Sequence, residues 1–221
     1  MLAAGLLPLL ALATACSGEP VSTEGTPQAL AAAVTEHYDA ELRAVAPLSA
    51  ADGYPEIEDD ELAVEMAFAA PGGGDNTHVR VVVSPTDPYV DDEYGFPDCE
   101  TFECEDLTGD LPDGGVDALL LWEQGHPEED PGAVVALADY GDHFVRAHAY
   151  GPLVTEDHAE DPEVSALSEA LAAVVTDPGV GYLVSEAYAE EGAEICAGDA
   201  WLDWYGQGNG TPRPDDLVEW C

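Results

Sequence analysis

The chain has 221 residues, of which 47 are acidic and only four are arginine or lysine, and its formal net charge is −43. This balance excludes most nucleic-acid functions, because binding needs cationic side chains to neutralise phosphates, and it disfavours adsorption to anionic lipid. A hydrophobic content of 46% argues against a disordered chain and is sufficient for a core.

The N-terminus begins with an apolar run, residues 2–12, which ends in Ala13-Thr14-Ala15-Cys16. The run is too short for a membrane-spanning helix, which needs about 20 residues, and has the length of a secretory signal with a small-residue cleavage site. The segment resembles the signal peptide and lipobox of bacterial lipoproteins. The resemblance implies cleavage before Cys16, lipidation of Cys16 by palmitate and related acyl chains, and a position on the extracytoplasmic side of the cell membrane. An ordinary cleaved signal with an unmodified Cys16 is the alternative.

The sequence divides into three parts. Residues 1–15 are the expected signal peptide, and residues 16–26 are the lipidated cysteine and a flexible tether of linker composition. Residues 27–221 have the length of one domain.

Periodicity and capping signals predict the elements of this domain. A helix begins at Thr26-Pro27 and keeps helical spacing as far as Val45, ending before Pro47. A second helix begins at Asp161-Pro162, and a short third one follows Ser185. Alternating patterns predict strands over residues 62–69, 79–83, 116–122, 133–138 and 143–150, of which the first two form a hairpin and 116–122 is central.

The order of these elements predicts an α+β fold. We expect an antiparallel sheet of about five strands in a meander, two main helices packed on one face, and a disulfide-closed C-terminal tail.

Four cysteines remain after Cys16, and an even number in an exported chain predicts two disulfides. Three pairings are possible, and we favour the two local ones, Cys99–Cys104 and Cys196–Cys221. The spacing of Cys99 and Cys104 does not match a zinc site.

The candidate binding residues lie on one face of the predicted sheet. If the valines of 79–83 and the small residues of 145–149 face the helices, the alternate side chains face away. This places together His78, Arg80, Arg146, His148 and Tyr150. Such a face suits an anionic or aromatic ligand; the alternative is cross-strand pairing with Glu65, Asp117 and Glu123. In a simple meander the two arginines lie about 14 Å apart.

Two other groups have a functional and a structural interpretation. Carboxylates between Asp87 and Asp98 either ligate calcium or form an ordinary solvated loop. Aromatic residues between Trp201 and Trp220 either stack on a glycan or partner or form a small core under the tail. No catalytic, nucleotide-binding or metal-binding motif is present, so we predict no cofactor and no metal.

Two function classes follow. The favoured one is a non-catalytic binding or interaction module at the cell envelope, whose partner is an unknown protein, glycan or small molecule. The alternative is an envelope hydrolase whose site is assembled only in the fold, with His148 or His143 contacting a buried carboxylate.

Overall fold

The structure is a computed structural model. It describes a large part of the expected domain, and the signal peptide, Cys16 and Cys221 lie outside the described residues. The described residues are 22–48, 58, 60–70, 77–85, 99, 102–112, 114–126, 130–155 and 161–196.

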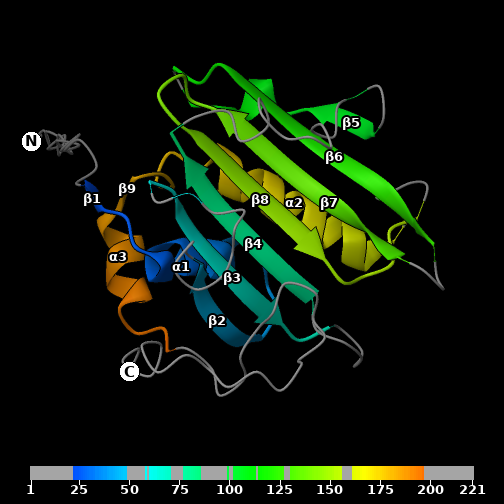
Figure 1. Cartoon of the computed structure of the whole chain (residues 1–221), viewed down its shortest axis with the longest axis horizontal. Coiled ribbons are helices and arrows are strands. Elements are labelled where there is room, and N and C mark those ends of the chain that lie inside the picture. The colour runs from blue at the N-terminus through cyan, green and yellow to red at the C-terminus, as the bar shows by residue number, and fades with distance from the viewer. Residues whose placement is uncertain are drawn as a thin grey trace, which may run out of the picture.

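The fold is mixed α+β, with a seven-stranded antiparallel sheet in the order β2-β3-β4-β8-β7-β6-β5 (Figure 1). Two further short strands, β1 and β9, pair with each other. The strands are β1 (Ser22–Glu24), β2 (Leu42–Leu48), β3 (Leu62–Phe68), β4 (Thr77–Ser84), β5 (Glu103–Asp106), β6 (Asp117–His126), β7 (Asp130–Asp139), β8 (Phe144–Tyr150) and β9 (Leu183–Ser185). The helices are α1 (Pro27–His37), α2 (Pro162–Thr176) and α3 (Glu186–Gly192), with one 3₁₀ turn, η2 (Thr108–Asp110).

The helices begin where their capping residues predict. Thr26 accepts a hydrogen bond from the Ala29 N–H at the start of α1, and Asp161 accepts bonds from the Glu163 and Val164 N–H groups at the start of α2. Ser185 caps α3 in the same way, through the Tyr188 N–H. Each side chain satisfies backbone donors that the first helical turn leaves without partners.

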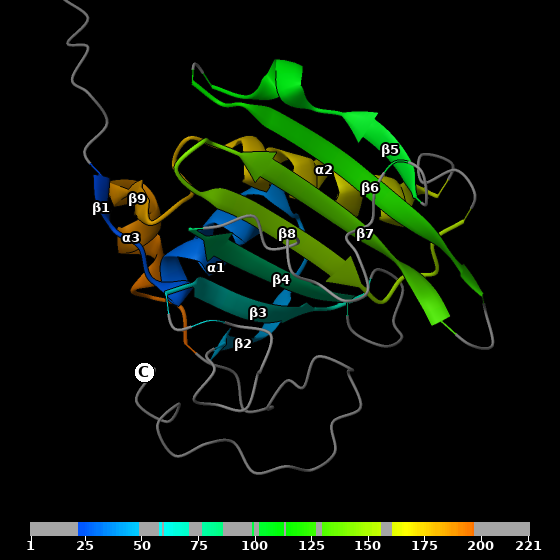
Figure 2. The ribbon, with the colours of Figure 1, turned by 45° about the horizontal axis from the view of Figure 1, so that its top comes forward.

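Helices α1 and α2 both lie behind the sheet, and α3 lies with β1 and β9 at one end of the molecule (Figure 2). The main core fills the space between sheet and helices. Its largest fully buried side chains include Leu30 of α1, Met66 and Phe68 of β3, and Leu167 and Leu171 of α2. Helix α3 comes so close to the start of α1 that a Cβ at Gly192 would lie 2.7 Å from the Ala29 nitrogen.

The first predicted helix is too long. Helix α1 ends at His37, and Leu42–Leu48 is the edge strand β2, paired with β3. The apolar residues of this segment fit both a helical and an alternating pattern. Pro47 is tolerated because an edge strand exposes N–H groups that need no ladder partner.

The sheet is larger than predicted and is not a simple meander. Two meanders, β2-β3-β4 and β8-β7-β6-β5, join where β4 pairs with β8. The 116–122 segment forms part of β6, which lies between β7 and β5 rather than at the centre. Every residue of β4 is buried, so both faces of this strand are removed from solvent.

The Cys99–Cys104 disulfide is present. Cys196 is also disulfide-bonded; its expected partner, Cys221, lies outside the described residues. Among the helices that the structure describes, none is long and apolar enough to cross a membrane.

Candidate functional site

The pairing of β4 with β8 brings the predicted sheet-face residues together. Arg80 lies opposite His148, and His78 lies opposite Tyr150. Arg146 lies opposite Val82, so it is a diagonal neighbour of Arg80, at about 7–8 Å between Cα atoms. The distance of about 14 Å expected for a meander is therefore wrong.

Glu65 of β3 pairs with this basic group from within the sheet. Its carboxylate lies 3.1 Å from the Arg80 guanidinium and 3.5 Å from Nδ1 of His78, and it has no exposed surface. This confirms the expected cross-strand pairing for Glu65. Asp117 instead accepts a hydrogen bond from the Thr108 hydroxyl, at 2.8 Å.

The electrostatics of this face act most strongly on His148. Its ring is partly buried and lies near Arg146 and Arg80, and burial followed by these two charges lowers the pKa of His148 to about 3. His148 is therefore neutral at physiological pH.

His143, the other histidine of the hydrolase alternative, stacks on Tyr140 with ring centroids 4.9 Å apart. Its Nδ1 lies 2.8 Å from Asp142, whose side chain is 87% exposed. This carboxylate is not buried, so the His143 pair lacks the enclosed environment in which acid–base pairs gain separated pKa values.

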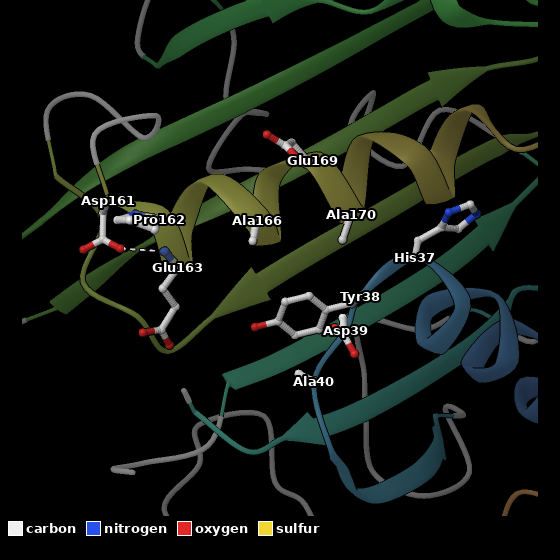
Figure 3. Close-up of a pocket in the computed structure, with 10 residues that line it drawn as sticks. All are labelled: His37, Tyr38, Asp39, Ala40, Asp161, Pro162, Glu163, Ala166, Glu169 and Ala170. Carbon is white, nitrogen blue, oxygen red and sulfur yellow. Dashed lines mark hydrogen bonds between the residues drawn. The ribbon is translucent and has the colours of Figure 1, made fainter. Parts of the chain in front are cut away.

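The structure also contains a pocket of about 590 Å³ that sequence reasoning missed, on the helical side of the sheet (Figure 3). One wall is the link between α1 and β2, formed by His37, Tyr38, Asp39 and Ala40. The other wall is the first half of α2, with Asp161, Pro162, Glu163, Ala166, Glu169 and Ala170.

Tyr38 is the most unusual residue of this pocket. Its side chain is only 5% exposed, and its ring packs edge-on against Phe68 at 5.1 Å. The ring extends along the pocket with its hydroxyl directed toward the Glu163 side (Figure 3). The Thr77 side chain lies close to this hydroxyl and lowers its pKa, but no hydrogen bond of normal geometry joins the hydroxyl to a residue that the structure describes. Such a group costs about 1–3 kcal/mol.

The carboxylates give the pocket a negative charge. Burial and the neighbouring Asp161 raise the pKa of Glu163 above its ordinary value. Burial raises the pKa of Tyr38 as well, against an opposing effect of Thr77 and with a further contribution from Glu163. Burial is the largest cause of both shifts, and it disfavours the charged form of each group.

Beside the pocket, Asp177 joins three elements. It accepts hydrogen bonds from the Tyr188 hydroxyl of α3 at 2.5 Å and from His37 Nε2 of α1 at 3.0 Å. Its other oxygen accepts the Gly179 N–H at 2.7 Å. Burial alone would raise the pKa of Asp177, but these hydrogen bonds outweigh it and lower the pKa.

The remaining predicted sites are placed as follows. Residues 87, 91–93 and 98 of the calcium alternative and the aromatic tail, 201–220, lie outside the described residues. Within the described part of the chain, no cluster of three or more His, Cys, Asp or Glu side chains could hold a metal ion.

Comparisons with known proteins give no relative for this chain. No family model, no curated protein and no solved structure matches it. The site must therefore be interpreted from its own chemistry.

Proposed function

We propose that this protein is a non-catalytic binding module, held on the extracytoplasmic side of the membrane by a lipidated Cys16, and that the pocket between Tyr38 and α2 is its ligand site. The observation that supports the site is the pocket itself. Its volume of about 590 Å³ lies in the range of small-molecule sites, about 300–1,000 Å³, and its buried Tyr38 hydroxyl has no hydrogen-bond partner of normal geometry among the described residues.

The described lining residues favour binding over acyl transfer by a serine, threonine or cysteine nucleophile. None of the ten lining residues is serine, threonine or cysteine, the usual nucleophiles of acyl transfer. The one histidine, His37, directs its Nε2 to Asp177 and Tyr188, outside the lining set. This arrangement stabilises the junction of α1, α2 and α3 and engages the histidine of the described lining residues in a structural contact.

Anchoring is supported by the apolar run, by the small residues before Cys16 and by the linker composition that follows. Two acyl chains are enough for stable attachment, whereas one is marginal. Intact-mass measurement of protein extracted from membranes tests this part. We expect a chain that begins at Cys16 and carries acyl mass; a chain without acyl mass at Cys16 contradicts anchoring.

Binding is tested separately, by ligand-observed NMR with a mixed set of cationic, neutral and anionic fragments. Ala166 is an exposed pocket residue, so we expect Ala166→Trp to obstruct the pocket without disturbing the core. The matched control is Ala187→Trp, on the exposed surface of α3. We expect fragment signals that Ala166→Trp abolishes and Ala187→Trp preserves; signals unaffected by Ala166→Trp contradict the site.

A further inference from the structure

We propose that the ligand of this pocket is a small amine, whose ammonium group lies between the α2 carboxylates and Tyr38 and whose alkyl body lies along the apolar wall. This inference rests on the proposed function and names the ligand class of the same site.

The first step is charge. Asp39, Asp161, Glu163 and Glu169 line the pocket, and no lysine or arginine is among the described lining residues. The positive end of the α2 dipole opposes a cation, but it amounts to about half a charge and is already capped by Asp161. Four carboxylates outweigh it, so an anionic ligand is excluded and a cationic one is favoured.

The second step is the Tyr38 hydroxyl. A phenol oxygen that lacks a well-formed hydrogen bond to the described residues can accept one from an N–H donor. An ammonium group supplies three such donors, enough for the hydroxyl and for Glu163 together. A quaternary ammonium ion supplies none and leaves the hydroxyl unsatisfied. The pocket therefore selects an amine over a fully substituted cation.

The third step is shape. Pro162, Ala166 and Ala170 of α2 and Ala40 of the facing segment are short or apolar lining residues. They accept an alkyl chain but offer it no hydrogen bonds. A bare metal ion does not use such a wall, and the pocket carboxylates do not form a metal cluster among the described residues. The carboxylates on both walls favour a diamine over a monoamine.

The test is isothermal titration calorimetry of the purified full chain with 1,4-diaminobutane at low ionic strength. We expect saturable binding at one site, with butylamine weaker and tetramethylammonium weaker by about ten-fold or more. Equal binding of tetramethylammonium overturns the role of the N–H donors. If the peptide Gly-Lys-Gly binds more tightly than the diamine, the proposal of a free amine ligand is overturned and a basic protein partner is favoured.

Variants assign any binding to the pocket, which is essential because a chain of charge −43 attracts cations everywhere. We expect Glu163→Gln to weaken 1,4-diaminobutane binding by about ten-fold and Tyr38→Phe by about five-fold. Glu105→Gln, an exposed change on β5 at the far edge of the sheet, should change it by less than about two-fold. Equal effects of Glu163→Gln and Glu105→Gln overturn the proposal.

Asp39→Asn is a second pocket variant, on an exposed residue whose change leaves the core untouched, and should also weaken binding. The outcomes separate the two proposals. If a neutral or anionic fragment binds and Ala166→Trp abolishes its binding, while 1,4-diaminobutane does not bind, the amine proposal is overturned but the pocket remains a ligand site. Fragment binding that Ala166→Trp does not change overturns both the ligand site and the amine proposal.

Discussion

Asp177 shows how a single side chain fixes the position of three helices. Its carboxylate receives the Tyr188 hydroxyl, His37 and the Gly179 N–H. A carboxylate with several hydrogen bonds in a half-buried position is stabilised in its charged form. Because the partners come from α1, α3 and the turn after α2, losing the charge loosens their junction.

We expect Asp177→Asn to lower the free energy of unfolding at pH 7 by about 1.5–3 kcal/mol, since it replaces charged hydrogen bonds with weaker ones. The pKa of Asp177 is lowered in the folded protein, so its contribution is present above 3.8 and is lost as the pH falls below that value. Urea unfolding at several pH values measures both effects. Asp142→Asn, at an exposed carboxylate paired with His143, is the control and should lower the free energy of unfolding far less than Asp177→Asn does.

The charge of Glu163 should affect the pH dependence of stability in the direction opposite to that of Asp177. Its pKa is raised by burial and by Asp161, so the folded protein holds the proton more tightly than the unfolded chain does. The resulting cost is absent in acid and appears as the pH rises through that pKa. We expect Glu163→Gln to raise the melting temperature at pH 7 more than Glu105→Gln does, and the difference to vanish near pH 4. Equal shifts at both pH values contradict the pKa assignment.

At the scale of elements, the buried ion pair between β3 and β4 constrains the register of the sheet. Glu65 has no exposed surface, and Arg80 is 4% exposed. Removing one partner of a buried pair leaves a charge without compensation in the interior. The pair therefore helps to fix the register in which Glu65 faces Arg80.

We expect Arg80→Ala to lower the free energy of unfolding by about 3–5 kcal/mol. The matched control is Arg43→Ala, which removes an arginine from an exposed pair with Glu41, at 2.9 Å. That change should cost less than about 1 kcal/mol. Chemical denaturation measures the free energy of unfolding of both variants. Similar decreases in the two would contradict the role of Arg80 in a buried ion pair.

Local signals predicted the elements that begin or end at capping residues. Asp161-Pro162 and Ser185 mark the starts of α2 and α3, and the alternation of 62–69 and 79–83 identified the β3–β4 hairpin. The sequence did not reveal that β4 pairs with β8, because neighbour choice depends on burial of both strand faces rather than on local pattern. It also misassigned β2, where apolar residues fit both periods.

The residues of the sheet face could be predicted from the sequence, whereas those of the pocket could not. Alternation along β4 and β8 was enough to place His78, Arg80, Arg146, His148 and Tyr150 on one face. Tyr38 and Glu163 belong to segments far apart in the chain, and Tyr38 fits the apolar pattern of a longer helix. Only the early end of α1 at His37 turns Tyr38 into a pocket residue.

For the molecule as a whole, the charge of −43 should make stability depend on salt. Mutual repulsion of the carboxylates is screened as the Debye length falls to about 3 Å at 1 M salt. We expect the melting temperature to rise steadily from low to molar sodium chloride in differential scanning calorimetry. A flat or falling melting temperature would contradict salt adaptation and favour biased coding as the origin of the acidity.

The most direct test of the central claim, that the pocket between Tyr38 and α2 is a ligand site for amines, is NMR of the chain labelled with ¹³C at the tyrosine Cζ. The resonance missing in Tyr38→Phe identifies Tyr38 among the nine tyrosines. On addition of 1,4-diaminobutane, we expect this resonance to shift with a saturable profile, because the hydroxyl gains a hydrogen-bond partner, while tyrosines remote from the pocket do not respond. A Tyr38 resonance that stays in place at saturating amine contradicts the account.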